Sequence, residues 1–158
     1  MQGDSATARR VVVEIYVLRA VADGRLAYRR LTGALGRAED PDSAARRLAG
    51  VGETVPLVHS TSWRCAADGG VVLTYAVAPD PEPARPATPL GPSAQVARGE
   101  RADRPAPDAV GPDQVAAHAA RHLAFLAEHD DVARAALTGD PLLAEAVARH
   151  APGMAGRL

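Results

Sequence analysis

Residues 59–64 are the part of the sequence best suited to chemistry. They read HSTSWR and place His59 among hydroxyl side chains. A histidine can donate or accept a proton near neutral pH, because its ordinary pKa is about 6.5. Tyr16 and Glu14 lie on an earlier apolar segment that could join the same sheet. One hypothesis is therefore a small enzyme in which His59 is the general acid or base, with Arg64, Tyr16 and Glu14 as assisting acid–base and anion-holding groups.

The alternative is that these side chains pack together and carry no chemistry. Leu, Ile, Val and Phe make up only 32 of the 158 residues, close to the composition at which a core becomes hard to fill. Such a chain needs its few aromatic rings, among them Tyr16, Trp63 and Tyr75, for burial. We favour this interpretation, in which Trp63 anchors the core and the neighbouring hydroxyl groups face solvent.

His118 and His122 form a second candidate site. On a helix, a spacing of four residues places both imidazoles on one face, where they can share a metal ion. A third ligand would have to come from elsewhere, with His59 and Cys65 as candidates, because His129 lies about 16 Å from His118 along the helix axis. The alternative is that both histidines pack against a sheet. We favour packing, and expect the purified protein to contain no cofactor and no histidine-bound divalent metal.

The composition argues against several classes of protein. The net charge of −1 is not that of a strongly basic nucleic-acid binder. The sequence has no P-loop, GxGxxG, HExxH or CxxC signature, and the single Cys65 cannot form an internal disulfide. Glu14 and Arg19 interrupt the apolar run 11–22, and a membrane span needs about 18–20 continuous apolar residues. We therefore expect a soluble, cytoplasmic protein with no membrane partner.

Three segments are predicted to be strands. Residues 11–18 and 71–78 are short runs dominated by β-branched and aromatic side chains. Residues 55–65 precede the second of these runs, and the Asp-Gly-Gly sequence 68–70 between them is typical of a hairpin turn. Either the first or the second pair of this sequence could form the tight turn.

Two helices are predicted between the first strand and the hairpin. Leu31 and Leu35 are four residues apart, which favours a helix over residues 25–38. Asp40-Pro41 is a cap followed by proline at the first helical position, and Gly50 is a suitable stop. This pattern predicts a second short helix over residues 41–50.

Residues 79–112 contain nine of the 13 prolines, so we expect a mainly extended arm or linker. Three short Ala-rich helices should follow. The first begins after Pro112, the second at Asp130 or Asp131, and the third at Asp140-Pro141.

Together these elements predict an α+β fold. We expect a small three-stranded, mainly antiparallel sheet with two short helices, a Pro-rich arm and three C-terminal helices packed on the sheet. The expected division is a flexible N-terminus (1–9), an α+β core (10–78), a Pro-rich arm or linker (79–112) and a C-terminal helical segment packed on the core (113–158).

The order strand, helix, helix, hairpin in the first half, with arginines clustered on both helices, resembles a winged helix. This resemblance implies DNA binding, with Arg46 and Arg47 on the recognition helix. The first predicted strand is long for that family, and the connection between the helices contains Glu39, Asp40 and Asp42, which would repel phosphate. A winged-helix-like DNA-binding protein stays an alternative, and we do not expect a nucleic-acid partner.

We favour a small non-catalytic binding or accessory protein, because the sequence has neither a catalytic signature nor a basic surface. It would hold a partner protein or a small-molecule ligand between the sheet and the C-terminal helices. Residues 1–50 carry a net charge of +3 and residues 51–158 a net charge of −4. This charge asymmetry and the exposed sheet edges favour self-association as a homodimer.

Overall fold

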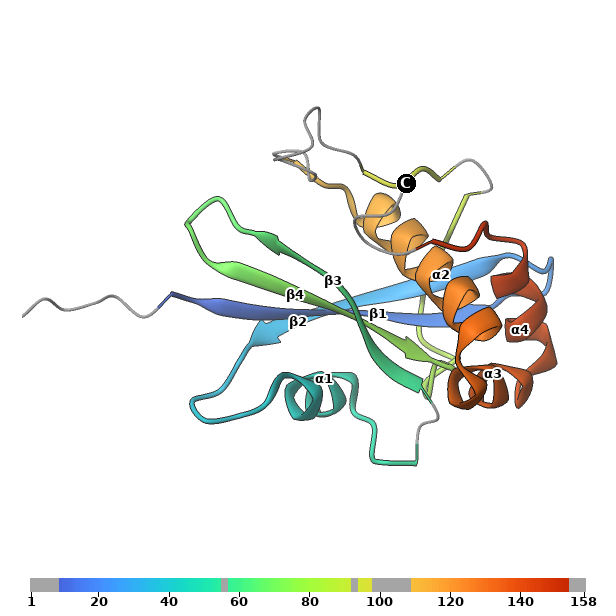
Figure 1. Ribbon diagram of the computed structural model, residues 1–158, viewed down its shortest axis with the longest axis horizontal. Coiled ribbons are helices and arrows are strands. Elements are labelled where there is room, and N and C mark those ends of the chain that lie inside the picture. The colour runs from blue at the N-terminus through green and yellow to red at the C-terminus, as the bar shows by residue number, and fades with distance from the viewer. Residues whose placement is uncertain (1–8, 55–56, 92–93, 98–108, 154–158) are drawn as a thin grey trace, which may run out of the picture.

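The computed structural model describes residues 9–54, 57–91, 94–97 and 109–153. It shows an α+β fold, which confirms the predicted class (Figure 1). Residues 1–8, most of the segment expected to be a flexible N-terminus, lie outside the described residues. The strands are β1 (Val11–Ala20), β2 (Leu26–Ala34), β3 (Leu57–Cys65), β4 (Val71–Ala78) and β5 (Thr88–Pro89). The helices are α1 (Pro41–Ala49), α2 (Pro112–His129), α3 (Asp131–Thr138) and α4 (Pro141–Ala148).

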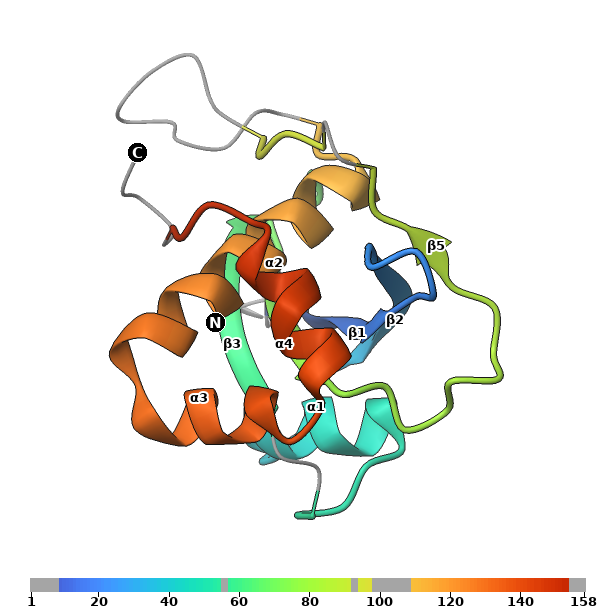
Figure 2. The same ribbon diagram turned by 90° about the vertical axis from the view of Figure 1, so that its right-hand side faces the viewer.

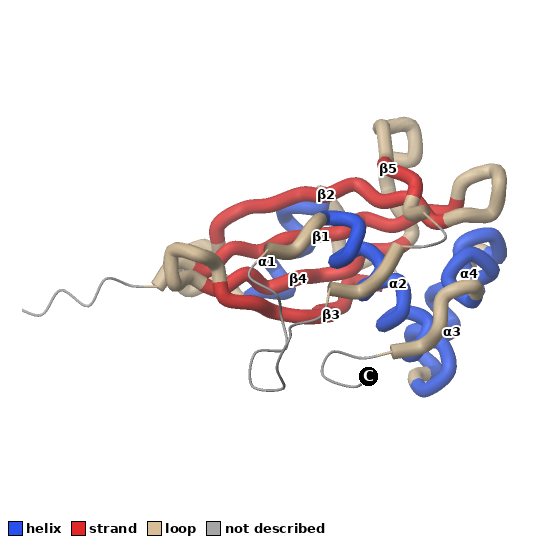
Figure 3. The backbone as a smooth tube through the Cα atoms, turned by 90° about the horizontal axis from the view of Figure 1, so that it is seen from above, coloured by secondary structure: helices blue, strands red, loops and turns tan. Residues whose placement is uncertain are grey.

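The five strands form one mixed sheet in the order β3-β4-β1-β2-β5, which Figure 3 shows side by side. β1 pairs with β4 in parallel, and the other neighbours are antiparallel. The prediction of a three-stranded, mainly antiparallel sheet was therefore wrong in strand number and in the pairing of the central strand. β1 takes the centre because its β-branched run can be buried on both faces and paired on both edges.

The predicted helix over residues 25–38 was also wrong, because residues 26–34 form β2. β2 pairs with β1 along its whole length, from Ala20 opposite Leu26 to Val12 opposite Ala34. The turn between them contains Asp23-Gly24, the same Asp-Gly signal that marks the other hairpin. The spacing of Leu31 and Leu35 favours a helix, but pairing of this segment with β1 outweighs that preference. Without this helix, the helix pair on which the winged-helix resemblance rested is not formed.

Helices cover both faces of the sheet (Figures 1 and 2). Val13, Ile15 and Val17 of β1 pack with α1 in one buried cluster, and Tyr16 and Leu18 pack with α2, α3 and α4 in another. The alternation of β1 side chains therefore separates two cores. A chain with few large apolar residues fills both of them largely with alanine from the helices.

The predicted short helix at residues 41–50 is confirmed as α1. The Asp40 side chain accepts a hydrogen bond from the Ser43 amide, and Gly50 ends the helix in the left-handed conformation. The Tyr75 hydroxyl donates to Asp42 at 2.6 Å, which ties β4 to this helix. A Cβ at Gly33 would lie 2.4 Å from Leu48, so the missing side chain lets α1 approach β2.

The predicted β3–β4 hairpin is confirmed, with Gly69 in the left-handed conformation at φ +79°. β3 contains an irregularity that the sequence did not predict. Its register against β4 shifts between Ser60 and Ser62, which is a β-bulge at Thr61. Because a bulge inserts one residue, His59 and Arg64 lie on the same face of the sheet, although an odd separation normally places two side chains on opposite faces.

The described part of the Pro-rich arm runs along the sheet. Its residues 88–89 form β5 against β2, and Leu90 is buried in the core under the C-terminal helices. Asp80 is held by a bidentate ion pair with Arg29 and a further ion pair with Arg19. The arm is therefore attached to β1 and β2 by buried charge pairs.

The three C-terminal helices are confirmed with their caps. The side chains of Asp130 and Asp140 accept hydrogen bonds from Ala133 and Leu143 at the starts of α3 and α4. Pro112 is the first residue of α2. None of the helices in the described ranges is long and apolar enough to cross a membrane.

The Asp23-Gly24 turn can be tested by substitution. Gly24 has φ +80°, so Gly24→Ala should lower the free energy of unfolding by about 1–2 kcal/mol. Gly52→Ala is the matched control, because Gly52 has no positive φ and nothing lies within 4 Å of its Cβ position. Urea unfolding should show the control within about 1 kcal/mol of wild type. Equal stability of the two variants would contradict this description of the turn.

Candidate functional site

The charged group at the centre of the sheet is Glu14, which is only 1% exposed. Arg30 on β2 donates through Nε to Oε1 at 2.7 Å, and Arg64 on β3 donates through Nη1 to Oε2 at 2.7 Å. The Thr74 hydroxyl also donates to Oε2 at 3.2 Å. Both carboxylate oxygens therefore accept hydrogen bonds. The side chain of Glu14 on β1 is linked in this way to β2, β3 and β4.

These contacts determine the protonation state of the cluster. Burial by itself would raise the pKa of Glu14, but the hydrogen bonds and charges of Arg64 and Arg30 lower it below its ordinary value. Burial, together with the nearby Glu14 charge, raises the pKa of Tyr16 well above its ordinary value. Glu14 is therefore ionised and Tyr16 neutral at pH 7, which suits a structural ion-pair cluster better than a proton-transfer pair.

The structure brings together three of the four residues predicted for catalysis and leaves His59 apart. The Tyr16 hydroxyl lies 3.5 Å from Glu14 Oε1, while Arg64 binds the other oxygen. In the described part of the chain, no hydrogen bond joins His59 to Glu14, Tyr16 or Arg64. Trp63 was expected to anchor the core, but it is 67% exposed, so that expectation was wrong. The bulge at Thr61 changes the register just before it.

His59 instead lies beside His122, with ring centroids 5.2 Å apart. His118, one turn earlier on α2, has its ring centroid 6.4 Å from that of His122, and its Nε2 lies 3.3 Å from the Thr61 carbonyl oxygen. The two histidines considered as a candidate metal pair, and favoured to pack against a sheet, therefore lie against β3, and His59 joins them. His129 is separate and stacks on Phe125 with centroids 4.1 Å apart.

We call His59, His118 and His122 the histidine cluster, and burial lowers the pKa of two of its members, His118 and His122. Burial lowers the pKa of His122 to about 4, and the neighbouring His59 and His118 lower it further. Burial also lowers the pKa of His118. Both ring nitrogens of His122 are buried and have no hydrogen-bond partner. Across the described ranges, no three His, Cys, Asp or Glu side chains are already arranged to hold a metal ion.

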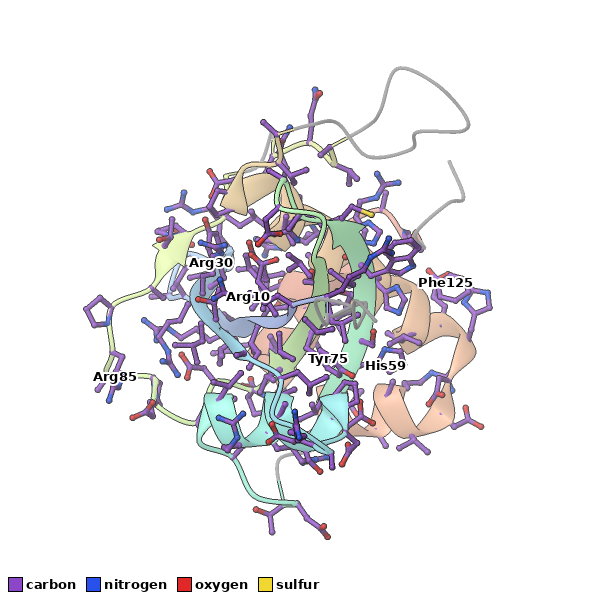
Figure 4. All side chains as sticks on the ribbon, turned by 90° about the vertical axis from the view of Figure 1, so that its left-hand side faces the viewer. Arg10, Arg30, His59, Tyr75, Arg85 and Phe125 are labelled. Atoms are coloured by element: carbon purple, nitrogen blue, oxygen red, sulfur yellow. The ribbon has the colours of Figure 1, made fainter. Side chains whose placement is uncertain are left out.

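An open pocket of about 420 Å³ lies on the other side of the molecule, at the outer edge of β2. Figure 4 shows Arg30 and Arg85 on this side, and His59 and Phe125 on the opposite side. The pocket is bounded by β2, the arm and the first residue of α2. Its lining residues are Tyr28, Arg29, Arg30, Leu31, Arg85, Pro86, Thr88 and Pro112.

The arginines of this pocket differ in their freedom to bind a ligand. Arg29 is buried and held by Asp80 in a bidentate pair. The side chains of Arg30 and Arg85 are 44% and 65% exposed, and each uses Nε for its carboxylate, Glu14 or Glu82. A guanidinium has five N–H donors, so the terminal nitrogens of these two arginines can still bind an anion.

The sequence analysis did not identify this pocket. The excess of arginine in residues 1–50 was visible in the sequence, but Arg29 and Arg30 fell within the helix predicted over residues 25–38. Arg85 lies in the arm, 55 residues after Arg30. The Asp23-Gly24 turn was the signal that could have placed Arg30. A hairpin at this turn makes residues 26–34 a strand, and Arg30 then lies on the same face as Tyr28.

No model of a known protein family matches the chain, and neither a curated protein nor a solved structure matches it.

Removal of the central charge tests the role of Glu14. Glu14→Gln should lower the free energy of unfolding by about 2–3 kcal/mol, because it leaves Arg30 and Arg64 without their shared counter-ion. The loss should be smaller than for a fully buried pair, since both arginines reach solvent. Glu145→Gln, which breaks the exposed pair with Arg149, should cost no more than about 1 kcal/mol. Urea unfolding of both variants provides the comparison, and equal losses would contradict a central role for Glu14.

The histidine cluster predicts a pH dependence of stability. Between pH 6.5 and about 4, the unfolded chain binds a proton at His122 that the folded chain does not. The titration of His122 therefore leaves the free energy of unfolding unchanged above pH 6.5. Below pH 6.5 it lowers the free energy of unfolding by at most about 1.4 kcal/mol per pH unit. His118 and His150, whose pKa values burial also lowers, act in the same direction.

The measurement is urea unfolding of chelator-treated protein at pH 7, 6 and 5. His122→Gln should flatten the dependence, while His129→Gln, at an exposed position, should leave it unchanged. An identical pH dependence in wild type and His122→Gln would show that His122 is not buried as described.

Proposed function

We propose that the protein is a non-catalytic binding protein whose pocket at the edge of β2 receives an extended, carboxylate-bearing segment of a partner protein. The observation that carries this proposal is the position of two exposed guanidinium groups, Arg30 and Arg85, beside an open sheet edge. The interior between the sheet and the C-terminal helices is filled by core side chains. The outer edge of the sheet, at β2, is therefore the better binding site for a partner.

The backbone of β2 supports an extended ligand. β5 pairs only with Ala27 and Tyr28, and the Leu26 carbonyl accepts a hydrogen bond from the Leu90 amide. Backbone groups that point to the same edge recur every second residue, so those of Arg30 and Thr32 also point outward. Both residues are exposed, and within the described ranges no strand pairs with them on this outer edge, the side of β2 away from β1. A partner segment could continue the line of β5 along this edge.

The side chains of the pocket support a ligand with carboxylate groups. The terminal nitrogens of Arg30 and Arg85 offer paired N–H donors, which match the geometry of a carboxylate. Tyr28, Pro86 and Pro112 provide apolar walls. The Tyr28 ring is fixed because its hydroxyl donates to Asp113 at 2.5 Å, across the start of α2. An acidic side chain and an adjacent apolar one would both find a partner here.

Binding can be tested with a fluorescent octapeptide of alternating Glu and Val residues. We expect the wild-type protein to bind it, more weakly as salt increases, and to bind a matched Gln/Val peptide at least about fivefold less tightly. Arg85→Ala should weaken binding of the Glu/Val peptide by about threefold to tenfold. Arg149→Ala is the control, because Arg149, which follows α4, is also an exposed arginine paired with a carboxylate.

Amide chemical shifts distinguish strand addition from capture of a single anion. Strand addition should shift the amide signals of Arg30 and Thr32 when the peptide is added. If free glutamate bound as tightly as the peptide, the sheet edge would contribute nothing and the proposed extended partner would be wrong. If Arg85→Ala and the Arg149→Ala control bound the peptide equally, the pocket would not be the binding site.

A further inference from the structure

The histidine cluster is a second place where the structure gathers groups capable of chemistry. His59 comes from β3, while His118 and His122 come from adjacent turns of α2. Their side chains meet where α2 packs against the edge strand, on the opposite side of the molecule from the pocket at β2 (Figure 4). The proposed binding function does not use these residues. Of the two third ligands considered from the sequence, His59 and Cys65, the structure places His59 beside His122.

Packing alone leaves His122 without any hydrogen-bond partner. Both of its ring nitrogens are buried without a hydrogen-bond partner, and these are the only such side-chain atoms in the described part of the chain. Leaving a buried polar group unpaired costs about 1–3 kcal/mol. Buried nitrogen atoms in folded proteins are therefore almost always paired with protein, water or an ion. His122 therefore lacks the partner that a buried ring nitrogen normally has.

We propose that His59 and His122 bind one first-row divalent transition-metal ion, such as Zn²⁺, Ni²⁺ or Cu²⁺, with His118 as a third ligand. Imidazole is a preferred ligand for all three ions. The rings of His59 and His122 are tilted by 43° with their centroids 5.2 Å apart, a separation that two imidazoles with metal–nitrogen distances of about 2.0–2.1 Å can adopt.

The third ligand requires a small rearrangement. His118 Nε2 lies 3.3 Å from the Thr61 carbonyl, a long contact that a metal–nitrogen bond can replace. This position explains why no three side chains in the described ranges are already arranged around an ion. His59 is only partly buried, so water can complete the coordination from the solvent side. We expected an empty site because the sequence could not show whether His59 or Cys65 lies close enough to His118 and His122 to be the third ligand.

The test begins with chelator-treated full-length protein titrated with Zn²⁺ and with Cu²⁺ by calorimetry. We expect one equivalent of each ion to bind, with Cu²⁺ tighter than Zn²⁺, following the usual order of divalent affinities. The electron paramagnetic resonance spectrum of the Cu²⁺ form should show coupling to at least two imidazole nitrogens. Saturating Zn²⁺ should raise the melting temperature of the wild type.

The variants assign the ligands. His122→Ala and His59→Gln should each weaken binding at least tenfold, and both should lose the thermal shift with Zn²⁺. His129→Ala is the matched control, because His129 lies on the same helix but stacks on Phe125, and it should bind like wild type. His59 is only partly buried, so His59→Gln keeps the test valid if His122→Ala does not fold.

Three results would overturn the proposal. The first is wild-type protein that binds no ion at one equivalent, which would mean that water or packing alone occupies the space beside His122. The second is unchanged binding in His59→Gln and His122→Ala, which would assign the ion to surface histidines or to Cys65. The third is loss of binding in His129→Ala. None of these results bears on peptide binding at β2, so the two proposals can fail separately.

Discussion

The burial of Glu14 in the central strand is the constraint on which the rest of the sheet depends. β1 is covered on both faces and paired on both edges, so a carboxylate within it has no access to water. Its charge must be balanced by groups that reach it from neighbouring strands, and Arg30 and Arg64 do so from β2 and β3. Removal of such a counter-ion leaves a buried charge unpaired, which is far more costly than loss of an exposed pair. The polar cluster that could have been a catalytic site is therefore better understood as the connection between three strands.

Local signals predicted the elements whose stability is local. The Asp40-Pro41 cap with Gly50 and the Asp140 cap lie at the positions expected, and Asp130 is one of the two caps expected for α3. The β3–β4 turn lies in the expected segment, but the Gly69 amide donates to the Ala66 carbonyl, so Ala67 and Asp68 are its central residues. β2 was missed because its identity depends on β1, to which it pairs across a turn. The leucine spacing in residues 25–38 was compatible with a helix, but pairing to a strand that needed a neighbour is worth more than intrinsic helix propensity.

The candidate sites were predictable in part, for a related reason. His118 and His122 could be placed on one helix face, because helical periodicity is a property of a single segment. Their proximity to His59 depends on α2 packing against β3, and the position of Arg64 depends on one inserted residue at Thr61. A bulge has no reliable signal in a single sequence, yet it reverses the face of every later side chain in the strand.

The arrangement of layers explains why both proposed sites lie at edges of the sheet. α1 packs on one face and α2, α3 and α4 on the other, so the small side chains that fill these two cores leave little interior space for a ligand. What remains accessible is the outer edge of β2, beyond the two residues covered by β5, and the junction of β3 with α2. At β2 the accessible groups are backbone amides and arginines, which suit an extended acidic segment. At the junction of β3 with α2, the partly exposed His59 lies beside the buried, unpaired His122, and imidazoles suit a metal ion. A sheet covered on both faces thus leaves its edges for binding, and the residues found at each edge determine the chemistry available there.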